Sequence, residues 1–276
     1  MIFRMAIPLE DTFADVLGKS AMGLSLGAPE IAERSGLSQS AVESLLGGEF
    51  DAGAAAAVAR PLGLDPARVV ALGSGTCPPP EIQPPAGLLG FNTPFGDMTV
   101  NSYLVWDATT GDAALFDTGA DADPALEALR DNRLTLRDIF LTHAHGDHVI
   151  EIDRLKELTG ARAWIGENEP LEGAASFAAG RSFVIGNLTV ETRPTPGHSA
   201  GATTYIVSEL STPLAIVGDA IFARSIGGPR VSFAEALATI RRHILTLPDE
   251  TILCPGHGPL TTVGDEKLHN PFFPNL

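Results

Sequence analysis

The sequence is poor in basic residues and in cysteine. Its 276 residues include 18 Lys and Arg against 34 Asp and Glu, which gives a formal net charge of −16. Because no basic excess is left to neutralise phosphates, this balance argues against a generic polyanion binder. The two cysteines, Cys77 and Cys254, lie far apart and form no C-x-x-C pair. A disulfide scaffold and a cysteine zinc site are therefore not expected.

Long apolar runs are also missing. No stretch reaches the roughly 18 uninterrupted apolar residues that indicate a membrane-spanning helix. The start, MIFRMAIPLEDTF, lacks the apolar run and small-residue cleavage site of a signal peptide, so we expect a cytoplasmic protein. Hydrophobic residues nevertheless make up 44% of the chain, which is enough for a sizeable core and rules out wholesale disorder.

The chain divides at the proline- and glycine-rich stretch GSGTCPPPEIQPPAG, which suits a connector between packed units. We expect a small helical domain at residues 1–75, a linker at 76–87 and a larger domain at 88–276. In the first unit, Ser38 is a candidate N-cap and Gly47 a candidate helix end. Asp65 and Pro66 indicate the start of a further helix.

The run IAERSGLSQSAVESLLGGE, with LGLDPARVVAL after it, resembles the Cro-like helix-turn-helix family. The resemblance implies two short helices joined by a turn and, in that family, DNA binding. However, the stretch that would enter the groove, SQSAVESLL, contains Glu43 and no Lys or Arg. Phosphate contacts normally dominate affinity. We therefore favour a packing role or a homodimer through these helices. DNA binding and an unrelated helical bundle are the alternatives.

The larger unit alternates strand and helix patterns in part. We expect strands at residues 99–107, 112–119, 136–143, 161–166, 181–193, 203–210, 213–220 and 250–257. Helices are expected at residues 123–132, 149–160 and 232–245. This order fits an α/β fold in which helices cover a two-sheet core.

The strongest chemical signal is THAHGDHV, which follows a predicted strand. It places His143, His145, Asp147 and His148 within six positions. Imidazoles and carboxylates are ligands for zinc, iron and manganese. Packing alone does not readily explain four such side chains so close together. The sequence therefore predicts metal binding here.

Three further metal-capable residues each follow a predicted strand: His198 in TPGHSAG, Asp219 in IVGDAIF and His257 in CPGHGPL. Any one of them alone would more often be a hydrogen-bonded turn residue or a cap. Together with the cluster they complete two sites. We assign His143, His145 and His198 to one ion, Asp147, His148 and His257 to the other, and Asp219 as the bridge. Three protein ligands and a shared carboxylate leave each ion open positions, as in catalytic sites.

The order T-H-x-H-x-D-H, P-G-H, G-D and P-G-H-G-P resembles the metallo-β-lactamase superfamily over residues 87–276. GDAIFARSIG, LPDETILCPGHGPLTT and LHNPFF are similar to the glyoxalase II-like branch. The resemblance implies a four-layer αββα sandwich and two divalent ions bridged by an aspartate and a water or hydroxide. Asp117, in ALFDTG, is then expected to orient a ligand histidine. Zinc is the first choice of metal, with iron and manganese as alternatives.

The expected activity is hydrolysis of a thioester or related acyl substrate, as in hydroxyacylglutathione hydrolases. A metal-bound hydroxide would attack, oriented by Asp147 and Asp219. Arg224, Arg230 and Lys267 are candidates for binding an anionic part of the substrate. The alternatives are a lactonase or β-lactamase, a persulfide dioxygenase with one iron, and a ligand-sensing DNA-binding regulator.

Overall fold

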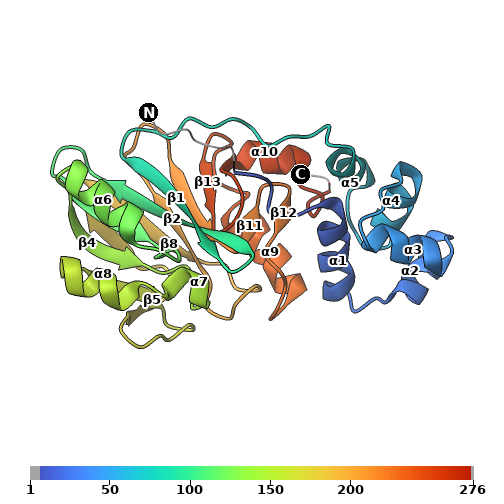
Figure 1. Ribbon diagram of the computed structural model, residues 1–276, viewed down its shortest axis with the longest axis horizontal. Helices are drawn as coiled ribbons and strands as arrows, with labels where there is room; N and C mark the ends of the chain where they lie inside the picture. The colour runs from blue at the N-terminus through green and yellow to red at the C-terminus, as the bar shows by residue number, and fades with distance from the viewer. Residues whose placement is uncertain (1–6, 275–276) are drawn as a thin grey trace.

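Two six-stranded sheets pack face to face, with helices on their outer surfaces and a separate group of helices at one end (Figure 1). The structure is a computed structural model and describes residues 7–274. This confirms the predicted four-layer sandwich preceded by a helical segment. The first six residues, on which the expectation about a signal peptide partly depends, lie outside the described range.

The first sheet has the strand order β1-β2-β3-β4-β5-β6. Its strands are β1 (Leu88–Phe95), β2 (Met98–Trp106), β3 (Asp112–Phe116), β4 (Thr135–Phe140), β5 (Arg162–Gly166) and β6 (Ala175–Phe177). β3, β4, β5 and β6 run parallel to one another. Their carboxyl ends therefore lie at one edge of the sheet.

The second sheet has the order β14-β13-β10-β9-β8-β7. Its strands are β7 (Ser182–Ile185), β8 (Leu188–Pro194), β9 (Thr203–Val207), β10 (Leu214–Gly218), β13 (Ile252–Pro255) and β14 (Thr261–Thr262). β9 and β10 are buried along their whole length, because sheet and helices cover both faces. A short hairpin, β11 (Ile221–Phe222) with β12 (Ser225–Ile226), follows β10.

The space between the sheets is filled by aromatic and aliphatic side chains. Phe116, Phe140 and Tyr205 form a cluster whose ring centroids lie 5.3 to 5.5 Å apart.

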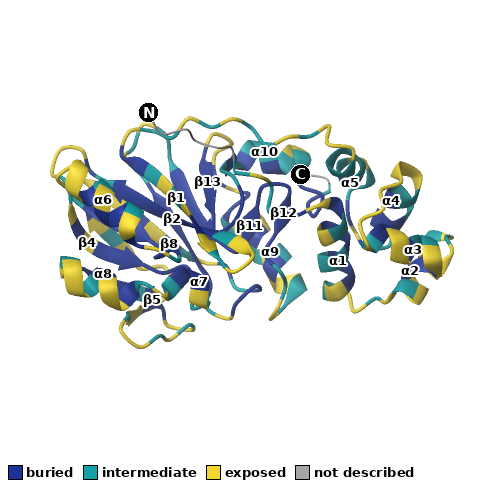
Figure 2. Cartoon of the chain, in the orientation of Figure 1, coloured by how far each residue is buried: buried dark blue, intermediate teal, exposed yellow. Residues whose placement is uncertain are grey.

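Five helices cover the outer faces of the two sheets. Those on the first sheet are α6 (Asp123–Asp131), α7 (Gly146–Val149) and α8 (Ile152–Thr159). Those on the second sheet are α9 (Phe233–His243) and α10 (Val263–His269). Each helix turns its buried residues inward, as Figure 2 shows.

The helices of the first unit are α1 (Phe13–Gly23), α2 (Ala28–Ser35), α3 (Gln39–Leu46), α4 (Ala52–Ala59) and α5 (Pro66–Gly73). The predicted caps are present, since Ser38 accepts from the Ala41 N–H and Asp65 from those of Ala67 and Arg68. The sequence analysis did not predict α1. Residues 76–87 contain no helix or strand.

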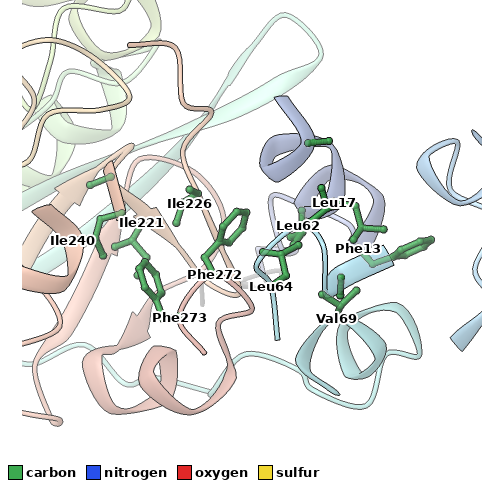
Figure 3. Packing of buried hydrophobic residues seen from close by; sticks show 14 of the residues in the cluster. Phe13, Leu17, Leu62, Leu64, Val69, Ile221, Ile226, Ile240, Phe272 and Phe273 are labelled. Carbon is green, nitrogen blue, oxygen red and sulfur yellow. The ribbon is translucent and has the colours of Figure 1, made fainter. Parts of the chain in front are cut away.

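The helical unit shares a hydrophobic cluster with the sandwich (Figure 3). Leu17, Leu62 and Leu64 belong to the same cluster as Phe272 and Ile226. Hydrogen bonds reinforce the contact: the Asp65 N–H donates to the Pro271 carbonyl at 2.9 Å, and Arg68 donates to the carbonyls of residues 270 and 273. The first unit is therefore docked on the C-terminal segment of the sandwich.

One strand prediction was wrong, and the short strands β6, β11, β12 and β14 were not predicted. The predicted strand 181–193 is split into β7 and β8 by a turn at Gly186, whose φ is +57°. Asp107 stabilises this turn by accepting hydrogen bonds from the Asn187 backbone and side chain. β1 was not predicted; Gly90 and Pro94 interrupt its pattern, which an edge strand tolerates. Within the described range, no helix is long and apolar enough to span a membrane.

Candidate metal centre

Metal-capable side chains converge where strands of both sheets end. The set comprises His143, His145, Asp147, His148, His198, Asp219 and His257. The first four follow β4 or lie on α7, and His198 lies in the loop after β8. Asp219 follows β10 and His257 follows β13, and these two strands are parallel neighbours. A rigid pair of sheets thus holds side chains that are distant in sequence.

The side chains fall into two groups. His143, His145, His198 and Asp219 form one, and Asp147, His148 and His257 the other; within each group the ligand atoms lie within 4.8 Å of one another. In the first, His145 Nδ1 lies 2.9 Å from His143 Nε2 and 3.0 Å from His198 Nε2. The structure therefore brings the residues together in the expected grouping. That they bind ions stays a prediction.

Asp219 lies between the groups. Its Oδ2 is 3.4 Å from His198 Nε2 and 3.5 Å from His257 Nε2, whereas its Oδ1 is 3.4 Å from His148 Nε2. The residue is 8% exposed. One carboxylate thus faces both groups, which is the geometry that the proposed bridge requires.

Backbone carbonyls orient two of the histidines. His198 Nδ1 lies 2.8 Å from the Gly228 carbonyl oxygen, and His257 Nδ1 lies 2.6 Å from that of Thr99. Because a carbonyl oxygen can only accept, each Nδ1 must carry the proton and donate it. The Nε2 lone pair of each ring is then directed to the centre, as a metal ligand requires.

Asp117 orients one histidine of each group. Its Oδ2 accepts from His148 Nδ1 at 2.9 Å and from the Thr142 hydroxyl at 2.8 Å. Since the Thr142 hydroxyl donates to Asp117, it accepts from His143 Nδ1, 3.0 Å away. The predicted supporting position of Asp117 is therefore where the structure places it, and Thr142 extends its effect to the group that contains His143.

The centre has the properties of a cation site. Among residues 7–274, His148 Nε2 and Asp219 Oδ1 are buried without a hydrogen-bond partner. Such atoms are costly unless something else binds them. His143, His145 and His198 also direct three ring nitrogens at one another, and one proton on His145 Nδ1 can satisfy only one of the two contacts fully, whereas a cation between the three can satisfy all of them. The donor set of imidazoles and carboxylates therefore fits divalent first-row metals.

The pKa shifts of the histidines also support a cation site. Burial lowers the pKa of His143 well below its usual range, so that ring is neutral and can act as a ligand. Burial also opposes the charge of His148 and His257, but neighbouring carboxylates prevail and raise their pKa values to about 10 and about 11. The second group thus attracts positive charge, which a bound metal ion would supply instead of these protons.

Two glycines permit the close packing around Asp219. A Cβ at Gly256 would lie 2.2 Å from Asp219 Oδ1, and one at Gly227 would lie 1.8 Å from the Asp219 carbonyl oxygen. Both distances are far below van der Waals contact. Any side chain at either position would therefore displace Asp219.

Arg224 does not reach the centre, which corrects the prediction that it binds substrate. It is 1% exposed, and its guanidinium forms ion pairs with Asp265 and Glu266. The guanidinium also donates to the carbonyls of Cys77 and Pro78 in the linker. Its hydrogen-bonding groups are committed to holding the hairpin turn, the linker and α10 together.

The other two candidate cations differ from each other. Lys267 pairs with Asp249 at 2.7 Å, which provides no support for substrate binding. Arg230 is exposed, and its charge adds to the effect of burial in lowering the pKa values of His145 and His198. Arg230 is therefore the one of the three predicted residues whose charge acts on the centre.

The sequence analysis missed several residues that shape the site. Thr142, Thr99 and Gly228 orient ligand histidines. The threonine that begins the T-H-x-H motif carried a signal, because a hydroxyl there can contact the first histidine. The backbone carbonyls of Thr99 and Gly228 gave no signal in the sequence, because every residue has a backbone carbonyl.

The comparisons with known proteins agree with this geometry. The sequence model of the metallo-beta-lactamase superfamily matches residues 95–257. The chain therefore belongs to this superfamily, whose members are metal-dependent hydrolases. The match begins after the helical unit and the linker.

Individual relatives are distant. Hydroxyacylglutathione hydrolase GloC from Haemophilus influenzae is 31% identical over 198 residues, covering 62% of this chain and 92% of that protein. The crystal structure of BLEG-1, a B3 metallo-beta-lactamase, matches with 29% identity and a TM-score of 0.61 over 68% of this chain and all of that one. TTHA1623 in a di-iron-bound form matches with 28% identity and a TM-score of 0.56, covering 66% and 99%.

Proposed function

We propose that this protein is a dinuclear metal-dependent hydrolase of thioesters or related acyl substrates, within the glyoxalase II-like branch. The observation that carries the proposal is the pair of adjacent ligand groups with the Asp219 carboxylate facing both. Two ions favour hydrolysis over a persulfide dioxygenase, for which the sequence analysis expected a single iron.

Bound divalent ions would activate water and polarise a substrate carbonyl. The side chains of the protein orient the water and hold the ligand rings in place. The carboxylates of Asp147 and Asp219 accept hydrogen bonds from the attacking water, orient it and can take up its proton. His145 is partly exposed, whereas His143, His148 and His257 are buried, so the substrate approaches from the His145 side. Asp117 and Thr142 keep the rings fixed during turnover.

The acyl substrate is supported by the similarity to GloC, a hydroxyacylglutathione hydrolase. The second candidate is a β-lactam, because BLEG-1 is a B3 metallo-beta-lactamase with a similar fold. Zinc is our first choice of metal, and the di-iron form of TTHA1623 supports iron as the alternative. Both metals suit the imidazole and carboxylate donors.

The test combines metal analysis with a substrate panel of thioesters, lactones and β-lactams. We expect two metal ions per chain and the highest kcat/KM with a thioester. Asp219→Ala is expected to lose metal and at least about a hundredfold of turnover, since a ligand to both ions is removed. His243→Ala, at the end of α9, is the control and should keep both. One iron per chain with oxygen uptake on a persulfide would overturn the proposal.

For the helical unit we propose a packing role. Its shared cluster with the sandwich supports this, as does the exposed surface of α3, where Gln39, Ser40 and Glu43 carry no positive charge. Two alternatives remain as proposals: a homodimer through these helices, and DNA binding. A mobility-shift measurement at low salt tests the latter, and a shift with any fragment would contradict the packing role alone.

A further inference from the structure

The first ligand group takes its histidines from loops of both sheets. His143 and His145 follow β4 of the first sheet, whereas His198 lies in the loop after β8 of the second. His145 Nδ1 nevertheless lies 2.9 Å from His143 Nε2 and 3.0 Å from His198 Nε2. The spacing of these three nitrogens therefore depends on the contacts that hold the two loops together.

One carboxylate joins the two loops. Glu169, in the turn after β5, accepts a hydrogen bond at Oε1 from the Ala144 N–H at 3.3 Å and one at Oε2 from the Gly201 N–H at 2.7 Å. Ala144 lies between two of the ligand histidines, and Gly201 lies three positions after the third. The two oxygens of a single side chain thus connect the loops that carry all three histidines of the first group.

The turn that carries Glu169 packs tightly against the loop of His198. The Glu169 N–H donates to the Gly166 carbonyl at 2.9 Å, which closes the turn. A Cβ at Gly201 would lie 2.5 Å from the Glu169 backbone nitrogen, and one at Gly166 would lie 3.0 Å from the Gly201 carbonyl oxygen. Glycine at both positions permits this close approach, so the backbone itself places the carboxylate beside the two loops.

A different side chain holds the loop of the second group. The amide of Asn101, on β2, donates to the carbonyls of Pro255 and Gly258 at 3.0 and 2.8 Å, and these two residues flank His257. Asn101 is buried, and its own carbonyl oxygen accepts from the Asn92 side chain at 2.8 Å. These hydrogen bonds do not involve the loops that Glu169 joins. Loss of the Glu169 contacts should therefore leave the second group in place.

We propose that Glu169 is a positioning residue for the ion held by His143, His145 and His198, and that it sets the affinity of this ion without affecting the other. The inference rests on the proposed function for the presence of two ions. A backbone N–H can only donate, so Ala144 and Gly201 each require an acceptor. A carboxylate offers two acceptor oxygens, whereas an amide offers one and directs an NH2 group at the other N–H.

The test is metal binding by the full-length protein with the substitution Glu169→Gln. Competition for cobalt(II) with a chromophoric chelator gives a Kd for each ion, and hyperfine-shifted imidazole N–H protons in NMR spectra show which histidines each ion binds. We expect the ion of the first group to bind about tenfold more weakly, because a contact that orients its ligands is lost, and the other Kd to stay unchanged. The matched control is Glu167→Gln, an exposed glutamate in the same turn, which should keep both values.

Equal weakening of both ions in Glu169→Gln overturns the inference, because a general loss of stability would act on both. Unchanged values overturn it as well. If the variant does not fold, amide hydrogen exchange of the metal-free wild-type protein decides. Protected N–H groups at Ala144 and Gly201 support the inference, and exchange at the rate of an unstructured peptide overturns it.

The outcomes also separate this inference from the proposed function. Selective weakening of the first ion in a protein that hydrolyses no panel substrate supports the role of Glu169 and overturns the proposed activity. Hydrolysis of thioesters by a protein in which Glu169→Gln changes neither Kd supports the activity and overturns the inference.

Discussion

At the scale of single residues, Asp117 lies outside both ligand groups, yet its hydrogen bonds affect both. One of its oxygens accepts from His148 and Thr142, and the other accepts from the Thr142 backbone N–H at 2.7 Å. Its φ of +55° lies in the left-handed region, which Asp and Asn tolerate better than most residues. Asn at position 117 would therefore keep the backbone conformation and remove one hydrogen-bond acceptor of the side chain.

For Asp117→Asn we expect metal affinity to fall by about tenfold to a hundredfold, because an amide NH2 cannot accept from His148 Nδ1. Competition with a chromophoric chelator measures the change. The control is Asp131→Asn, an exposed residue at the end of α6, which should retain wild-type affinity. Unchanged affinity in Asp117→Asn would show that the Asp117 contact does not orient the ligands.

The same scale shows what sequence could and could not predict. The four residues from His143 to His148 were identifiable because metal-capable types are concentrated there. Arg224 was misassigned because sequence gives a charge but no burial.

At the scale of elements, the hairpin β11–β12 links Asp219, the proposed bridge, to the carbonyl that orients His198. Gly227 and Gly228 follow it, and they differ sharply in available space. A Cβ at Gly227 would collide with the Asp219 carbonyl oxygen, whereas a Cβ at Gly228 meets nothing within 4 Å. The two positions form a natural pair for testing the hairpin.

We expect Gly227→Ala to lower both metal content and the melting temperature, because the hairpin must move away from Asp219. Gly228→Ala keeps its carbonyl for His198 and should differ little from the wild type. Metal analysis and thermal unfolding of the two variants provide the comparison. Similar behaviour of the two variants would contradict the close packing that we describe.

Strands were easier to predict than their turns. β10 is a run of apolar residues and β9 is made of β-branched and aromatic residues, and both patterns are visible in sequence. The break at Gly186 depends on Asp107, which lies on a distant segment and stabilises the turn. α1 was missed although its sequence carries a signal, since Thr12 and Asp15 form a capping box and Val16 and Leu17 are buried apolar residues.

At the scale of the whole molecule, the helical unit and the sandwich share one hydrophobic cluster. Phe272 is 2% exposed, and in Figure 3 it lies between Ile226 on the sandwich side and Leu64 on the helical side. Burial of this kind couples the stability of the two parts. The chain should therefore unfold as a unit and not as two independent domains.

Phe272→Ala is expected to lower the free energy of unfolding by about 3 to 5 kcal/mol, as truncation of a buried aromatic ring does. Denaturant titration measures this. Leu268→Ala, at a residue that is 64% exposed, should change it little. Two well-separated transitions in the wild-type protein would contradict the coupling.

The docking of α5 on the C-terminal segment has a consequence for biosynthesis. Asp65 and Arg68 bond to backbone atoms of residues 270–273, which a ribosome produces long after it has made the helices. Part of the apolar surface of the nascent helical bundle stays uncovered until residues 270–273 have been made. Anything that delays the synthesis of residues 270–273 would expose that surface to chaperones or to neighbouring nascent chains.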